Sequence, residues 1–379
     1  MVPDTDSIQP CRRTGRRVTI ILLIVFVLVA GWAWLWKFAA SRAETAVAGW
    51  RAREARAGRV YSCGTQSVGG FPFRIELTCG KASALLRSKA TPLVEIRTPS
   101  VLVGADLYQP DTLTSRFVGP LTVGAPGKPP GIWVNWTFAQ STVHGTPSAP
   151  ERVTLEFERP TVDRIVGGKH QSLLSARRIA LEGRIASGSP SDHPVIEVSL
   201  KAVRASAPGL HPAAAPPINM HLAARLTGLA DFAPKPWAER FREMQAAGGR
   251  IEITHARIKQ GNTLAVGKGS LSIDANGQLA GQLSVTVAGL KPFLDAIGAG
   301  KAVAQSPNMD KFAGMLDRLS PGLGDVARQQ AGANLGLGIS MLGKPATLNG
   351  RRAVTLPLRF ADGVAYLGPI PLGPTPALF

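Results

Sequence analysis

Alternation of apolar and polar residues is the strongest pattern in this chain, and the segment VGGFPFRIELTCG (68–80) shows it clearly. Strict alternation predicts a β-strand with one buried face and one face in solvent. Arg74 is then expected on the wet face, and because Pro72 has no backbone N–H, the strand is expected to begin at a sheet edge or to contain a bulge. The buried face would hold the odd-numbered residues Phe71, Phe73, Ile75, Leu77 and Cys79.

Further alternating segments follow as far as about residue 206. The clearest are at 132–138, 153–157 and 196–202, and Pro- and Gly-rich turn clusters separate them. Short alternating strands with no helix-length pattern between them predict an antiparallel meander rather than a parallel α/β sheet.

A Pro-, Ala- and Gly-rich stretch at 205–217 predicts a linker or an extended crossing between two β-rich regions, 59–206 and 207–379. Helices are predicted in the second region, near 236–247 and 291–333. The predicted fold class is mainly β (α+β): a long curled antiparallel meander with a few helices in its C-terminal half. The two regions show no exact repeat.

The uncharged apolar run VTIILLIVFVLVAGWAWLW (18–36) is close to the ~20 residues that a helix needs to cross a bilayer. Tryptophans cluster at its end, where indole rings favour the membrane–water interface, and four arginines in the basic tail 1–17 predict a cytoplasmic N-terminus. A helical stalk is predicted at 37–58, with Trp50 docked on the sheet. A cleaved signal peptide is the alternative, because AAS (39–41) offers small residues for cleavage.

The composition is basic, since 43 Lys and Arg against 25 Asp and Glu give a formal net charge of +18. Such a charge favours nucleic acid or an anionic lipid surface as partner. The basic residues are spread over strands and turns without aromatic interleaving, which argues against nucleic acid. We therefore expect attraction to anionic headgroups. The base composition of the genome is the alternative explanation for part of the bias.

Cys63 and Cys79 are the only cysteines after the apolar run, and in an oxidising compartment they fit a disulfide. Pairing about a turn at Gly69-Gly70 does not set them opposite each other, so a bulge or a longer loop is required. Two free buried thiols are the alternative, and metal binding by two lone cysteines is a weaker one.

Motifs for catalysis or cofactor binding are missing from the sequence. The six histidines form no His-Glu-x-x-His arrangement, and there is no Gly-x-Ser-x-Gly elbow. GNTLAVGKGS (261–270) lacks the glycine spacing of a phosphate loop, and PGLGDVA (321–327) follows a predicted helix rather than a strand. We expect no metal, no cofactor and no enzymatic activity; a hydrolase is an unsupported third reading.

The apolar faces of the predicted strands have a larger area than three or four helices can cover. They must close into a sandwich or barrel, or stay partly open as a groove. We expect an exported, tethered protein of this kind to bind lipid or another hydrophobic ligand in envelope maintenance. A closed dry core competes with the groove, and a structural or assembly protein that binds envelope partners without a ligand is the alternative function. The predicted lining residues of a groove are Phe71, Phe73, Ile75, Leu77, Val134, Trp136, Phe138, Leu155 and Phe157.

Residues 49–79 resemble the start of domain-of-unknown-function family 2125, a family of uncharacterised bacterial membrane-anchored proteins. Segments 105–123 and 361–372 resemble its later blocks, so the resemblance covers roughly residues 40–379. That family has no established activity to carry over. Segment 269–297 is more distantly similar to AsmA-like envelope proteins, which are long β-sheet proteins implicated in lipid handling. The residues that carry the family signature are Trp50, Cys63, Cys79, Gly70, Phe71, Pro72, Phe73 and Arg74.

Together, the residues and the resemblance lead us to expect a single-pass inner-membrane protein with its N-terminus in the cytoplasm and its β domain in the periplasm. Its expected partners are the membrane, a lipid or acyl chain, and envelope proteins. The chain is much shorter than the large AsmA-like proteins, which argues against its bridging the periplasm alone.

Overall fold

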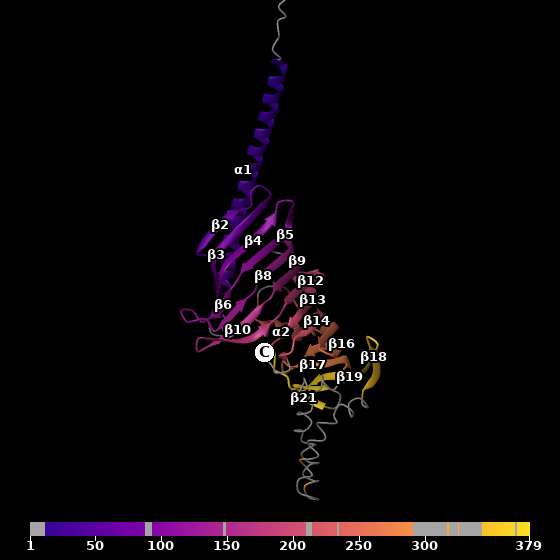
Figure 1. Ribbon diagram of the computed structural model, residues 1–379. Coiled ribbons are helices and arrows are strands. Elements are labelled where there is room, and N and C mark those ends of the chain that lie inside the picture. Colours follow the sequence, from indigo (N-terminus) through magenta and orange to yellow (C-terminus); the bar gives the residue numbers. More distant parts are fainter. Residues whose placement is uncertain are drawn as a thin grey trace, which may run out of the picture.

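The fold is mainly β, as predicted, and consists of one long antiparallel sheet that does not close into a barrel. The computed structural model describes residues 12–87, 93–146, 149–209, 214–232, 235–290, 317, 325, 343–367 and 370–379. Helix α1 (Arg12–Arg56) projects from one end of the sheet with its N-terminal half and lies against the first strands with its C-terminal half (Figure 1). The short helix α2 (Trp237–Ala246) packs on a strand far along the sheet.

The strands follow one another along the sheet almost in chain order. Their bounds are β1 (Arg59–Ser62), β2 (Thr65–Gly69), β3 (Arg74–Leu86), β4 (Val94–Asp106), β5 (Gln109–Val118), β6 (Leu121–Gly124), β7 (Ile132–Asn135), β8 (Phe138–Thr146), β9 (Ala149–Glu158), β10 (Thr161–Val166), β11 (Lys169–Ser175), β12 (Arg178–Ser189), β13 (Asp192–Ala205), β14 (Ile218–Leu226), β15 (Ile251–Gln260), β16 (Thr263–Ile273), β17 (Leu279–Ala288), β18 (Lys344–Leu348), β19 (Arg351–Ala361), β20 (Val364–Leu367) and β21 (Ile370–Pro374).

Several of these strands are halves of longer, bent strands. β1 and β2 pair with the two halves of β3, and β5 and β6 pair with the two halves of β4. In the same way β7 and β8 continue one another, as do β9 and β10, and β11 and β12. When each pair is counted as one bent strand, the sheet is a plain meander from β1 to β17, and β19 then adds to β17.

The bends in neighbouring strands meet in a crease across the sheet, and Trp136 fills it. Its side chain is 9% exposed, its indole N–H donates to the Phe117 carbonyl (2.9 Å), and its ring meets the ring of Phe157 edge-on. The Thr137 N–H donates to the Glu158 carbonyl across the same line (3.0 Å). The Trp136 N–H donates to the Asn135 side-chain oxygen (3.0 Å), so these two peptide N–H groups keep partners at the bend.

The segment 68–80 is not one strand, which corrects the prediction. β2 ends at Gly69, residues 70–73 form a turn, and β3 begins at Arg74. Gly70 has φ +94°, a conformation that favours glycine, and a Cβ there would lie 2.8 Å from the Arg74 carbonyl oxygen. Phe71 and Phe73 consequently lie in the turn and more than half exposed, rather than on a buried strand face. Pro72 also lies in the turn, so β3 begins without a missing donor and has partners on both sides.

The segment 132–138 is also divided, because β7 ends at Asn135 and β8 begins at Phe138. Ala139 is 2% exposed and points to the apolar side of the sheet, so its neighbour Phe138 points to the other side, where it faces Glu158 in the register. Apolar and polar residues keep alternating across residues 136 and 137, whereas the strand is interrupted there.

The remaining predicted elements fit the structure to different degrees. The predicted membrane segment 18–36 and stalk 37–58 are parts of the single helix α1, and α2 lies at the helix predicted near 236–247. The helices predicted near 291–333 lie outside the described residues, apart from residues 317 and 325. β13 pairs with β14, so the sheet continues across the predicted linker 205–217.

The crease makes a prediction that two tryptophans can test. We expect Trp136→Ala to lower the free energy of unfolding by about 3–5 kcal/mol, because it empties a packed site and removes an indole donor. The matched variant Trp237→Ala, at a side chain 76% exposed, should change it by no more than about 0.5 kcal/mol. Urea denaturation of both variants provides the measurement, and equal effects would show that the crease is not a packed site.

Candidate functional site

The two faces of the sheet differ sharply in chemistry. Residues directly opposite each other in antiparallel strands share a face, and alternate residues along a strand share it too. One row of opposite residues that starts at Leu77 on β3 is almost wholly apolar and reaches β14. Its members are Leu77, Val103, Ser115, Ser141, Leu155, Leu181, Leu200 and Leu222.

The neighbouring rows on this face are also apolar, and we call the whole surface the apolar face. Ile75 lies opposite Ala105 and Leu113 in one row, and Phe157 lies opposite Ile179 in another. From β3 to β14 the surface crosses seven inter-strand spacings of about 4.8 Å, which makes it on the order of 30 Å long.

The opposite face is polar and carries paired charges. Arg178 donates to Glu156 (2.8 Å), and Glu197 accepts hydrogen bonds from Arg225 and Arg184. These hydrogen bonds, that from Arg225 first, lower the pKa of the Glu197 carboxyl below its usual value. Such a surface belongs in water, so the sheet has one wet side and one apolar side along most of its length.

The apolar face is covered at its two ends. α1 packs on β1 and β3, and Leu77 and Cys79 are buried there. At the other end, Met244 of α2 packs with Leu229 and Ile273, and Phe379 at the C-terminus joins this cluster.

The middle of the apolar face is partly exposed, although Ala202 within it is buried. Val153 on β9, Leu181 on β12 and Ile258 on β15 each keep about two fifths of their side-chain surface accessible. Ile258 lies opposite Met220, which lies opposite Ala202 and so belongs to the same face. No described helix other than α1 and α2 lies against the sheet. Among the described residues, therefore, the apolar face is partly exposed between two covered ends.

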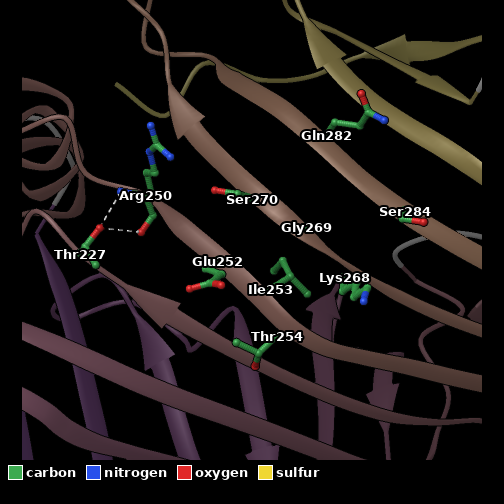
Figure 2. A pocket seen from close by; sticks show the side chains of 10 residues that line it. All are labelled: Thr227, Arg250, Glu252, Ile253, Thr254, Lys268, Gly269, Ser270, Gln282 and Ser284. Carbon is green, nitrogen blue, oxygen red and sulfur yellow. Dashed lines mark hydrogen bonds between the residues drawn. The ribbon is translucent and has the colours of Figure 1, made fainter.

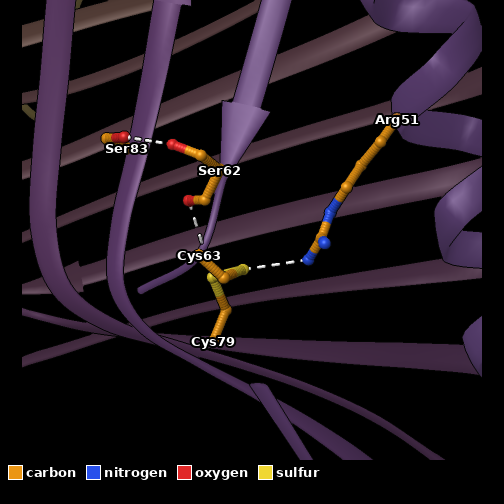
Figure 3. Close-up of a disulfide and its surroundings, with 5 residues drawn as sticks. All are labelled: Arg51, Ser62, Cys63, Cys79 and Ser83. Atoms are coloured by element: carbon orange, nitrogen blue, oxygen red, sulfur yellow. Dashed lines mark hydrogen bonds between the residues drawn. A yellow bond between two sulfur atoms is a disulfide. The ribbon is translucent and has the colours of Figure 1, made fainter. Parts of the chain in front are cut away.

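The joint between α1 and the sheet includes a disulfide, which confirms that prediction (Figure 3). Cys63 and Cys79 are joined with their Cα atoms 5.3 Å apart, and Arg51 of α1 donates to the Cys63 sulfur (2.9 Å). Cys63 and Gly64 separate β1 from β2, which both pair with β3. This break is the irregularity that the predicted disulfide required. The bond therefore ties the first bent strand to β3 directly beneath the helix.

Tryptophans of α1 complete this joint. The indole N–H groups of Trp32 and Trp36 donate to the carbonyls of Pro72 and Arg74 (2.9 and 2.7 Å). Trp50 lies 4.8 Å from the ring of Tyr61, and burial raises the pKa of the Tyr61 hydroxyl. The helix is thus held to the sheet at points more than one turn apart.

A separate hollow lies on the polar face where β15, β16 and β17 meet, and it has a volume of about 820 Å³ (Figure 2). Arg250, Glu252 and Lys268 line it together with hydroxyl and amide groups, so side chains of both charges face the space. Thr227 at its edge accepts a hydrogen bond from the Arg250 N–H (3.0 Å). The described residues contain no group of three or more His, Cys, Asp or Glu side chains that could hold a metal ion.

The predicted lining residues therefore separate into groups. Ile75, Leu77, Leu155 and Phe157 lie on the apolar face. Val134 lies on β7 beyond the crease, Trp136 fills the crease, Phe138 points to the polar side, and Phe71 and Phe73 occupy a turn. Three exposed residues of the face were missed: Val153, Leu181 and Ile258. Val153 alternates with Leu155, and Leu181 with Ile179, so both were detectable by the same rule.

Comparison with known protein families assigns the chain to one of them. The family described as "uncharacterized protein conserved in bacteria (DUF2125)" matches residues 36–376. The chain belongs to this family. The match covers the C-terminal part of α1 and almost the whole sheet. A search of curated proteins found no match, and the expected similarity to AsmA-like proteins has no support from these comparisons.

The disulfide of this DUF2125 member makes a second prediction. We expect Cys63→Ser/Cys79→Ser to lower the stability of the β1–β3 region by about 3 kcal/mol, because the bond closes a loop of sequence separation 16. Hydrogen exchange of β2 and β3 amides should rise, with Cys11→Ser as the matched control for loss of a thiol. Unchanged exchange at β2 and β3 would mean that α1 alone holds this region.

Proposed function

We propose that this protein binds the acyl chains of lipids or lipidated molecules along the apolar face, without catalysis, in maintenance of the bacterial envelope. The observation that carries the proposal is the exposed middle of that face, marked by Val153, Leu181 and Ile258. Soluble surfaces seldom leave a continuous apolar patch of this length without a ligand or partner that covers it.

The length of the apolar face suits an acyl chain. An acyl chain in one leaflet spans about half of the ~30 Å hydrocarbon core of a bilayer, and the apolar face is at least as long. Each CH₂ group that moves from water to such a surface contributes about 0.8 kcal/mol. A chain of this kind therefore gains enough free energy to stay bound even when part of it remains in solvent.

The proposed location is the inner membrane, with the N-terminus in the cytoplasm and the sheet in the periplasm. α1 is the one helix among the described residues that is long and apolar enough to cross a membrane. The arginines that precede its apolar part support this orientation by the positive-inside rule. The disulfide supports an oxidising compartment for the sheet.

An assembly role is the second candidate, and the unclosed sheet favours it. The outermost strands of an open sheet present unpaired backbone groups that another chain can extend. In that case a protein, rather than a lipid, would accompany the purified chain.

Two valines of equal exposure give a matched test of acyl-chain binding. Val153 on the apolar face and Val203 opposite Arg178 on the polar face are each 38% exposed. We expect Val153→Arg to reduce co-purified lipid several-fold, because a charge on the apolar face must be desolvated when an acyl chain covers it. Val203→Arg should leave the lipid content unchanged. Mass spectrometry of lipid extracts measures both, and equal lipid content in the two variants would contradict the proposal.

The orientation has its own test. We expect alkaline phosphatase fused after Phe379 to be active and a green fluorescent protein fused there to be dark, since the first requires an oxidising compartment to fold. The opposite pair of signals would place the sheet in the cytoplasm and remove the proposed location.

A further inference from the structure

We propose that two hairpin tips of the sheet enter the interfacial region of the bilayer that α1 crosses, so that the apolar face begins at the membrane surface. The tips are the turn at residues 70–73, between β2 and β3, and the turn at residues 107–108, between β4 and β5. We call Phe71, Phe73 and Tyr108 the tip aromatics. The inference rests on the proposed anchoring by α1, and it adds a second contact between this protein and the membrane.

The tip aromatics are exposed although they are large and apolar. Phe71 is 53% exposed, Phe73 is 52% and Tyr108 is 71%. Turns are normally built from Gly, Pro, Asn, Asp and Ser, which tolerate the backbone geometry and water. The two tips lie together, because the rings of Phe73 and Tyr108 are 5.8 Å apart. The result is one aromatic patch shared by two neighbouring hairpins.

This patch is continuous with the aromatic end of the membrane helix. The rings of Trp32 and Phe73 lie 6.3 Å apart, and those of Trp36 and Phe71 lie 5.5 Å apart. The indole hydrogen bonds to the Pro72 and Arg74 carbonyls fix the first tip against the helix. The same turn of α1 exposes Trp34 on another side.

The depth of the tips follows from these contacts. Tryptophans at the end of an apolar span lie at headgroup level, where an indole ring is apolar on its face and polar at its N–H. Trp32 and Trp36 are four residues apart, so their levels along the helix differ by about 6 Å. The first tip contacts both tryptophans and therefore lies at their level, and the second tip lies beside the first. The interfacial layer on each side of the core is of similar thickness, about 5–8 Å.

The charges at the tips indicate which lipids are needed. Arg74 pairs with Asp106 (2.8 Å) and with Glu76 (3.3 Å), so the base of the tips carries no excess positive charge. Attraction to anionic headgroups is therefore not the source of the contact. The contact depends instead on burial of the aromatic rings, so a zwitterionic bilayer is sufficient for it.

The tips lie between the bilayer and the apolar face. Ile75 follows the first tip, and its row on the apolar face continues through Ala105 and Leu113. An acyl chain that leaves the leaflet beside the tips meets this row first. The tips therefore set the entrance of the proposed binding surface at the depth of the headgroups.

The experiment measures the depth of one tip in the full chain. Cys11→Ser removes the unpaired thiol, Tyr108→Cys introduces a label site, and the disulfide is kept intact by labelling without reductant. The protein carries the environment-sensitive fluorophore NBD in nanodiscs of phosphatidylcholine that contains nitroxide lipids. We expect nitroxide near the headgroup to quench the label at position 108 several-fold more than a label at Trp237→Cys on α2.

A second variant separates the tip contact from the anchor. Phe71→Ser/Phe73→Ser should bring quenching at position 108 down to the level at position 237, while α1 keeps the protein in the nanodisc. Val166→Ser, at an exposed apolar residue that ends β10 just before the turn to β11, should leave the quenching unchanged.

Several results would overturn the inference. Equal quenching at positions 108 and 237 would place the tips in water, and a label at 108 shielded by a bound protein would show a protein interface instead. Failure of the chain to enter nanodiscs would remove the anchor and the tip contact together. Lipid that still co-purifies when the tips are unquenched leaves acyl-chain binding standing, so the two proposals fail separately.

Discussion

Every strand of the sheet is paired, and one face is mostly apolar from β3 to β14. The main requirement on the rest of the molecule is therefore to cover that face. The described helices cover only the ends, α1 over β1 and β3 and α2 over β16. The polar face satisfies its own charges through pairs such as Arg178 with Glu156, and it contributes nothing to the apolar side. The exposed middle is therefore a property of the architecture as a whole, and substitution of one residue would not create or remove it.

The joint at the start of the sheet combines interactions of three kinds. A covalent bond joins Cys63 to Cys79, indole hydrogen bonds join α1 to the turn at 70–73, and the Trp50 and Tyr61 rings pack together. Each acts within the first strands, so the orientation of the sheet relative to α1 is set there. A rigid connection of this kind makes the depth of the helix in a membrane decide where the sheet begins.

The sequence was a good guide to the fold and a weaker guide to the site. Period-two alternation is a local property, so it correctly indicated strands and an antiparallel meander. The same rule misplaced Phe71, Phe73 and Phe138, because alternation in sequence continued where the backbone turned or broke. The disulfide was found because only two cysteines follow the apolar run. The sequence did not predict which part of the apolar face is exposed. That depends on which strands the helices contact, and no residue of the face itself indicates it.

The order of the strands has a consequence for how the chain folds. Because neighbours in the sheet up to β17 are also neighbours along the chain, each strand finds its template already in place when it emerges. Most loop closures are then short, and such contacts form quickly. The disulfide-linked segment at the start completes its hairpin before any later strand exists. Synthesis from the N-terminal end therefore matches the order in which this sheet can grow.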